Sequence, residues 1–361
     1  MKVFIILNND KCRTKSVLIS RSRIFMSKKL KVLFRTAGGK AKNEELGFGH
    51  IFRCINLSNV MNNCNKHFLV EDYGSVNKVL QSRGYNNIVN VPPGINLDYD
   101  LKKTLYCIRR EKIDILIVDK FNLNHNYVQQ LRNYVKTVVI SYLHKFEFNA
   151  DLVVNGFIGY ENKVLTNRFG TKCLLGPKYQ ILDKKYSKII PVRKKQYSIL
   201  ATFGGFDKNN ITSILYKQLI HHLNNISAKI ILGPATKKTP LIKSIESSSN
   251  RIIIVKETND MKKDILLSEF GICAGGITAY EFAIMQVPFA IICQYKHQLL
   301  AAREWERKGA AFNFGLPGKR TKKMICDLLK NFEEKKTLLK NKKIFIDGLG
   351  SQRVAQEIFK L

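Results

Sequence analysis

No stretch of the sequence reaches the roughly 18 consecutive apolar residues that a membrane-spanning helix needs. The opening apolar run ends at Asn8, which is too short for the about 7–15 residues of a secretory h-region. The eight cysteines include no C-x-x-C pair, so a paired-thiol redox motif or a zinc motif is not indicated. These absences predict a cytoplasmic protein whose cysteines stay reduced.

Acidic residues are also scarce, because 28 Asp and Glu stand against 61 Lys and Arg, a net charge of +33. The electrostatic field of such a positive charge attracts nucleic acid, anionic lipid and phosphorylated ligands, and it does not select among them. The basic residues are spread along the chain, and no RNP, helix-turn-helix or zinc-finger pattern organises them. We therefore predict no specific nucleic-acid partner, and keep phosphate attraction and a peripheral position beside an anionic membrane surface as interpretations.

Short apolar runs separated by helical periodicity recur along the chain, which is typical of βαβ units with a buried parallel sheet. The first series predicts strands at Lys31–Arg35, His67–Val70, Ile113–Val118, Thr137–Ile140 and Asp151–Val154, and helices at Ile51–Asn62, Val76–Arg83, Asp100–Glu111 and Asn126–Tyr134. The second series predicts strands at Tyr197–Thr202, Lys229–Leu232, Arg251–Val255, Phe270–Cys273 and Pro288–Ile292. The fold class is therefore α/β.

A length of 361 residues indicates two domains, and a polar, basic connector around Asp183–Gln196 separates the two series. We predict a flexible N-terminal extension over 1–29, an N-terminal Rossmann-like domain over 30–185, a C-terminal domain over 196–345 and a C-terminal helix over 346–361. Doubly wound domains bind ligands at the carboxyl ends of their strands, so the working loops should lie between the two domains.

The first candidate site is Gly47-Phe-Gly49-His50-Ile-Phe-Arg53, which follows the first expected strand and opens a helical pattern. Glycine allows a close approach of backbone to ligand, and a histidine near a helix N-terminus would face the cleft. An imidazole with an ordinary pKa near 6.5 can act as a general base at neutral pH. The alternative is a capping histidine, with glycines that serve only the turn.

The second candidate site is Phe203-Gly204-Gly205-Phe206-Asp207, at the end of the first strand of the second series. Paired glycines in such a turn can present backbone amides to a phosphate. The alternative is a tight turn in which Asp207 only caps the following helix.

The third candidate site, Ala274-Gly275-Gly276-Ile277-Thr278, joins a buried strand directly to a helix. A diphosphate could rest on this helix N-terminus, and Glu281, one turn further on, could accept hydrogen bonds from both hydroxyls of a ribose. The alternative is structural, because Thr278-x-x-Glu281 also fits the capping-box pattern. Lys296-His297-Gln298 follows a later strand and could complete the phosphate and sugar contacts.

In their order and spacing, these motifs resemble the UDP-sugar hydrolases of pseudaminic acid biosynthesis and the related spore-coat polysaccharide proteins. The resemblance spans residues 31–312 and includes Phe34-Arg35 and Leu175-Gly-Pro-Lys-Tyr179. It implies the GT-B fold, with two Rossmann-like domains facing each other across a cleft, no metal and no cofactor. It also implies that His50 activates water, while UDP is held by the carboxyl-terminal domain. The residues expected to bind substrate or nucleotide are Arg35, Gly47, Gly49, Arg53, Gly204, Gly205, Asp207, Gly275, Gly276, Ile277, Thr278, Glu281 and Gln298.

Three departures from the hydrolase pattern fall in the N-terminal domain. The chain has Val118-Asp-Lys120-Phe121 where the hydrolases carry Val-Asp-His-Tyr, Ser141-Tyr-Leu-His144-Lys145 where they carry an acidic pair, and Ala37 in place of an acid. This domain arranges the nucleophile, so UDP binding is better supported than hydrolysis. The roles of Lys120 and His144 stay open.

Four functions therefore remain. They are a UDP-sugar hydrolase that supplies a free sugar for a surface glycan or a nonulosonic acid, a glycosyltransferase with an acceptor, a nucleotide-sugar-binding protein without catalysis and, least favoured, a nucleic-acid binder. A metal-dependent transferase is not favoured. Asp98-Tyr-Asp100 spells the D-x-D of such enzymes, but two acids just before a helix are more often caps. We assign no metal.

Overall fold

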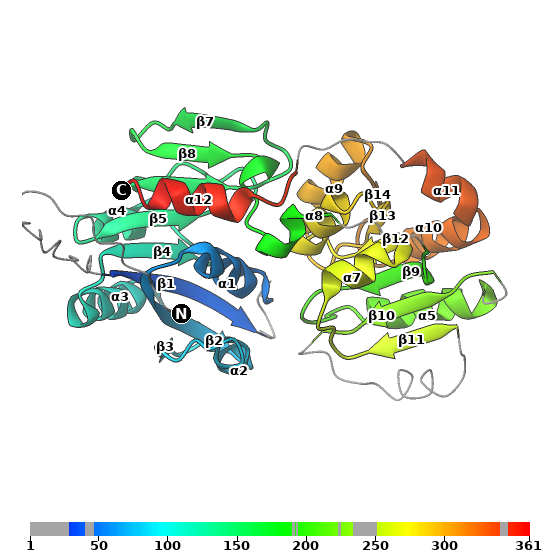
Figure 1. The fold of residues 1–361 in the computed structure, drawn as a ribbon, viewed down its shortest axis with the longest axis horizontal. Helices are drawn as coiled ribbons and strands as arrows, with labels where there is room; N and C mark the ends of the chain where they lie inside the picture. Colours follow the sequence, from blue (N-terminus) through cyan, green and yellow to red (C-terminus); the bar gives the residue numbers. More distant parts are fainter. Residues whose placement is uncertain are drawn as a thin grey trace, which may run out of the picture.

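The computed structural model describes residues 29–39, 47–189, 192, 194–222, 225–233, 251–339 and 346–361. The predicted N-terminal extension, apart from Lys29, lies outside these residues, as do Pro191 and Arg193 of the predicted connector. The described chain forms two α/β domains, each built on a mainly parallel sheet (Figure 1), as the alternating pattern predicts. No helix in these ranges is both long enough and apolar enough to span a bilayer.

The first sheet has eight described strands in the order β3-β2-β1-β4-β5-β6-β8-β7, and only β7 runs antiparallel to its neighbour. The strands are β1 (Leu30–Gly39), β2 (Cys64–Tyr73), β3 (Ile88–Val91), β4 (Ile115–Asp119), β5 (Lys136–Ile140), β6 (Leu152–Asn155), β7 (Lys163–Thr166) and β8 (Lys172–Leu175). The helices are α1 (Gly49–Val60), α2 (Val76–Gln81), α3 (Leu97–Glu111), α4 (His125–Arg132), η1 (Pro177–Tyr179) and η2 (Lys184–Ser187). Apolar clusters bury both faces of this sheet.

The second sheet has six described strands, all parallel, in the order β11-β10-β9-β12-β13-β14. The strands are β9 (Tyr197–Thr202), β10 (Ala228–Ile231), β11 (Ile252–Val255), β12 (Ser268–Cys273), β13 (Phe289–Ile291) and β14 (Ala311–Asn313). The helices are α5 (Ile211–Leu219), η3 (Ile220–His222), α7 (Met261–Leu266), α8 (Ile277–Ile284), α9 (Gln298–Arg307), α10 (Lys319–Lys330), α11 (Phe332–Leu338) and α12 (Gly350–Ile358).

Both sheets reverse their strand order beside the first strand of the domain. β1 lies between β2 and β4, and β9 lies between β10 and β12. At such a switch point the connections after the two central strands leave toward opposite faces and open a crevice at the carboxyl ends. The start of α1 and the loops before α5 and α8 lie at these crevices, which is why all three glycine motifs contribute residues to the same region.

The strands that the sequence pattern misses are β3, β7, β8 and β14. β3 and β7 are edge strands in which at least half of the residues are exposed, so they lack the continuous apolar run that identifies a buried parallel strand. β8 and β14 are only four and three residues long. The ten predicted strands all occur, with boundaries shifted by a few residues.

The predicted C-terminal helix corresponds to α12, and it packs on the first domain rather than the second (Figure 1). Val354 and Ile358 are fully buried in the same apolar cluster as Ile51 of α1. Ser351 Oγ donates a hydrogen bond to the Leu182 carbonyl oxygen at 2.5 Å, which ties α12 to the segment that leads to the second domain. The chain therefore passes between the domains twice.

Candidate active site

A cavity of about 840 Å³ lies between the domains, within the size range of small-molecule sites. It opens at the carboxyl ends of both sheets, where the switch points lie. Of the residues expected to bind or act on substrate, those that line it are Gly47, Gly49, His50, Arg53, Gly204, Gly275, Gly276, Ile277, Thr278, Glu281 and Gln298. Arg35, Gly205 and Asp207 are not in the lining.

On the amino-terminal wall, His50 is held by Asp119, the last residue of β4. The distance between His50 Nδ1 and Asp119 Oδ1 is 2.5 Å, and Arg53 Nε donates to Asp119 Oδ2 at 2.8 Å. Because β4 lies beside β1, and α1 follows β1, the carboxylate at the end of β4 reaches the first turn of α1. Asp119 was not among the expected site residues.

The tautomer of His50 follows from this contact. An ionised carboxylate can only accept, so Nδ1 must carry the hydrogen that Asp119 receives. Arg53 Nη2 lies 2.8 Å from the same nitrogen, and its hydrogen is taken by Asp119 Oδ1 at 2.6 Å. We therefore assign the lone pair to Nε2, which has no hydrogen-bond partner among the residues that the structure describes.

The charge states suit a general base. Burial lowers the pKa of His50 below the ordinary 6.5, although Asp119 opposes this shift. Burial alone would raise the pKa of Asp119, but the charge of Arg53 and the hydrogen bonds from Arg53 and His50 outweigh it and hold that pKa below its usual range. The rings of Phe121 and Tyr142 pack edge-on against the imidazole, with centroids at 4.4 and 6.4 Å. At neutral pH the site therefore holds an uncharged, sheltered imidazole beside an anion.

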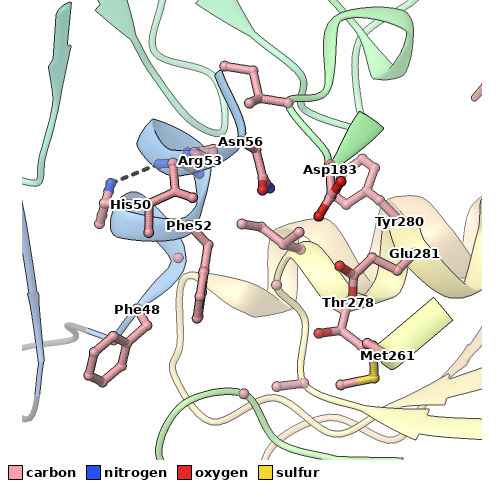
Figure 2. A pocket seen from close by; sticks show the side chains of 18 of the residues that line it. Phe48, His50, Phe52, Arg53, Asn56, Asp183, Met261, Thr278, Tyr280 and Glu281 are labelled. Atoms are coloured by element: carbon pink, nitrogen blue, oxygen red, sulfur yellow. Dashed lines mark hydrogen bonds between the residues drawn. The ribbon is translucent and has the colours of Figure 1, made fainter. Parts of the chain in front are cut away.

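The opposite wall is the N-terminus of α8. Figure 2 shows Thr278 and Glu281 of this helix facing His50 and Arg53 of α1. Gly276 is the N-cap, and no side chain caps the helix, so the Thr278-x-x-Glu281 pair does not form a capping box. The first N–H groups of α8 and the positive end of its dipole are thus available to an anion in the cavity.

Two carboxylates share the part of the cavity that adjoins α8. Burial raises the pKa of Glu281 to about 7. Asp183, which belongs to the segment between the domains, points into the same space (Figure 2), and its Oδ1 accepts a hydrogen bond from the Lys185 N–H at 3.0 Å. The amide of Asn56 on α1 also faces the cavity and has no hydrogen-bond partner within the described ranges. Neither Asp183 nor Asn56 belongs to the motifs found in the sequence.

The paired glycines after β9 have different roles. Gly204 has a φ of +79° and lines the cavity, so its backbone can face a ligand in a conformation that favours glycine. Gly205 instead allows the domains to approach, because a Cβ there would lie 2.5 Å from Phe48 Cδ2. The expected ligand contact of Gly205 is thus replaced by a contact with the residue before α1.

Asp207 caps α5, which was the structural alternative in the sequence. Its two oxygens accept hydrogen bonds from the N–H groups of Ile211 and Thr212, both at 2.8 Å. Gln298 does line the cavity, and its Oε1 accepts a hydrogen bond from the Gln294 N–H at 2.8 Å. It therefore also orders the loop before α9.

Arg35 lies outside the cavity, in a buried ionic cluster on the other face of the sheet. Its Nε and Nη2 donate to Asp100 at 2.6 and 2.9 Å, and Nη2 also donates to Glu71 at 3.1 Å. Lys120 Nζ donates to Asp100 at 2.6 Å, and these four residues are at most 6% exposed. The expectation that Asp100 caps a helix was wrong, since Asn96 caps α3.

His144, whose role the sequence leaves open, lies among packed aromatic side chains. His144 packs edge-on against Phe157 and Tyr160, with centroids at 5.0 and 5.8 Å, and is not in the cavity lining. Among the described residues, no group of three or more His, Cys, Asp or Glu side chains could hold a metal ion.

Comparison with known sequences gives distant relatives, and no family model matches the chain. Over 271 residues, the chain is 24% identical to an uncharacterized protein of Methanocaldococcus jannaschii; the match covers 70% of this chain and 54% of that protein, about half its length. Over 262 residues, it is 22% identical to the spore coat polysaccharide biosynthesis protein SpsG of Bacillus subtilis, covering 68% of this chain and 76% of SpsG.

Comparison with solved structures extends over nearly the whole chain. MurG of Acinetobacter baumannii superposes with a TM-score of 0.60 at 15% identity, covering 92% of this chain and 100% of that one. MnaA of S. aureus, in a co-structure with UDP, superposes with a TM-score of 0.59 at 13% identity, covering 92% and 96%. At these identities the likeness concerns the fold alone. Two parallel-sheet domains in this arrangement therefore give the chain the GT-B fold.

Proposed function

We propose that the chain binds a UDP-sugar between its domains and breaks the bond from the anomeric carbon to the diphosphate, with His50 as general base. The observation that carries this proposal is one cavity with a sheltered His50–Asp119 pair on one wall and the uncapped N-terminus of α8 on the other. The relatedness to SpsG and the bound UDP in MnaA support it.

The diphosphate would lie against residues 275–278, where the free N–H groups of α8 can donate hydrogen bonds to its oxygens. Glu281 would accept hydrogen bonds from the ribose hydroxyls. His50 Nε2 then takes the proton of a hydroxyl group whose oxygen attacks the anomeric carbon. The bond to the diphosphate oxygen breaks, and its electron pair leaves with UDP, whose developing charge the helix N-terminus stabilises.

Two nucleophiles are compatible with this chemistry. Water would give a free sugar for surface polysaccharide synthesis, which is the reaction that the hydrolase resemblance implies. A hydroxyl of an acceptor would give a glycoside instead. The second reaction is favoured by the cavity itself, which continues along α1 toward α2, beyond the region between His50 and α8.

The direct test incubates purified protein with a panel of UDP-sugars, without metal or acceptor, and measures released UDP and free sugar. We expect UDP to bind whichever nucleophile the protein uses. Free sugar should appear if the nucleophile is water. Binding without release would assign the reaction to transfer. If UDP and all UDP-sugars fail to bind, the proposed function is wrong.

The pKa of Glu281 predicts how UDP affinity depends on pH. The ribose hydroxyls bind the carboxylate, so binding favours the deprotonated form of a group whose pKa is about 7 in the free protein. Affinity should therefore rise with pH and weaken by about tenfold between pH 8 and pH 6. Calorimetric titrations with UDP across this range measure the effect.

The matched variant for this measurement is Glu281→Gln, which keeps the size of the side chain and removes the titration. Its UDP affinity should be lower than that of the unmodified protein at pH 8 and should follow only the titration of UDP's own phosphates. An identical pH dependence in both proteins would rule out Glu281 as the ribose-binding group.

A further inference from the structure

The cavity has an arm that the nucleotide and His50 do not account for. On one side, α1 presents Phe52, Asn56 and Asn59, which share a helix face at positions i, i+4 and i+7. The distance from Phe52 to Asn59 along the helix axis is about 10 Å. On the other side, α2 and its flanking turns contribute Ser75, Lys78, Val79, Ser82 and Arg83. We call this space the α1–α2 arm.

The arm carries two cations that have no anionic partner in the described part of the chain. Lys78 and Arg83 are exposed, and neither forms an ion pair with any described residue. Arg83 is nevertheless held in place, since its guanidinium lies 5.4 Å from the ring centroid of Phe52 and Nη1 donates to the Val79 carbonyl oxygen at 3.0 Å. Arg53 differs, because Asp119 already binds its guanidinium.

The cavity has its described carboxylates on one side, together with Lys185 and Lys256. Its described carboxylate lining consists of Asp183, from the segment between the domains, and Glu257 and Glu281, from the second domain. The α1–α2 arm contains no carboxylate among its described residues. The cations of the arm thus lie on the wall opposite α8, where the diphosphate would not use them.

We infer that the α1–α2 arm binds an acceptor alcohol that carries an anionic group, a phosphate ester or a carboxylate. A planar guanidinium can pair with two oxygens of such a group, and Lys78 supplies a second charge. Water needs no such site. The inference rests on the proposed function and specifies its nucleophile as the acceptor hydroxyl.

The reaction then balances as a transfer. The acceptor oxygen forms a bond to the anomeric carbon, and its proton passes to His50 Nε2. The bond between that carbon and the diphosphate oxygen breaks, and UDP leaves with the electron pair. The products are a glycoside that keeps the anionic group of the acceptor, UDP, and a proton on His50.

The test is calorimetric titration of glycerol 3-phosphate into protein saturated with UDP, with glycerol as the neutral comparison. The variant K78A/R83A removes both cations of the arm. The control K322A/K323A makes the same change of net charge at two exposed lysines of α10, outside the cavity lining. Vesicles of phosphatidylcholine with and without phosphatidic acid distinguish a lipid phosphate from a soluble one.

We expect glycerol 3-phosphate, but not glycerol, to bind, and K78A/R83A to weaken binding by at least about tenfold while K322A/K323A does not. UDP affinity should stay within about twofold in both variants, which also verifies folding. Binding only to phosphatidic acid vesicles, lost in K78A/R83A, would assign the same chemistry to a lipid headgroup.

Equal binding of the phosphate probes by K78A/R83A, or no binding by the unmodified protein, would overturn the inference while UDP binding still supports the proposed function. If K78A/R83A instead loses affinity for UDP-glucuronate but not UDP-glucose, the anion belongs to the sugar donor, and the acceptor assignment is wrong. Loss of UDP binding by the unmodified protein is a different failure, because it removes the proposed function itself.

Discussion

The variant His50→Ala is expected to release UDP about 10²–10⁴-fold more slowly than the unmodified protein, the range that general bases contribute. The reason is that Nε2 of His50 carries the available lone pair in the site and is oriented by Asp119. UDP affinity should change little, since the nucleotide is proposed to bind to the second domain. Single-turnover release of UDP, with the substrate that the panel identifies, measures the effect separately from binding.

Asp119→Asn is the companion variant because it nearly preserves shape. An amide can donate to Nδ1, which would move the hydrogen of His50 to Nε2 and abolish the base, so the loss of rate should approach that of His50→Ala. Thermal unfolding of both variants controls for the partly buried Arg53, which loses its counter-ion only in Asp119→Asn. If His50→Ala keeps the full rate, His50 is not the base, and another group must be sought.

The variant Arg35→Met is expected to lower the free energy of unfolding by about 3–5 kcal/mol, as when one partner of a buried ion pair is removed. Asp100 and Glu71 would then share Lys120 as their remaining cation within the described cluster. Chemical denaturation at pH 7 measures the loss. The exposed Arg110→Met is the matched control and should change the value by less than about 0.5 kcal/mol.

This destabilisation should shrink as the pH falls. Burial would raise the pKa of Asp100, but Arg35 and Lys120 outweigh it and hold that pKa below the ordinary 3.8. A carboxylate whose pKa is depressed in the folded state stabilises the fold at pH values above its unfolded-state pKa. That stabilisation is lost as the pH falls through the folded-state pKa. If Arg35→Met loses almost no free energy of unfolding at pH 7, or if its loss grows on acidification, the cluster is not a structural ion network.

Much of the fold could be predicted because buried parallel strands leave long apolar runs, and the three glycine motifs mark the turns that follow them. The sequence could not settle which glycines face a ligand. Gly204 and Gly205 are equivalent in the pattern, yet the positive φ of Gly204 and the approach of Phe48 from the other domain to Gly205 distinguish them. The expectation that Arg35 belongs to the binding site was not met for a similar reason, because its ionic partners come from α3 and β2.

Asp119 shows how one missed residue could have been found. It ends a strand whose partner strand leads directly to the His50 helix, so a strand order of β1 beside β4 would have brought the two together. Asp183 and the α1–α2 arm carry no comparable signal. Their positions depend on the path of the segment between the domains and on the packing of α2, which local sequence does not encode.

The return of α12 to the first domain has a consequence for synthesis of the protein. A ribosome makes α1 early and α12 only after the whole second domain, yet Ile51 and Val354 belong to one apolar cluster. Domains generally fold in order as the chain emerges. Here the first domain keeps an uncovered apolar surface beside α1 until α12 has been made. The time needed to translate the second domain sets how long that surface stays exposed.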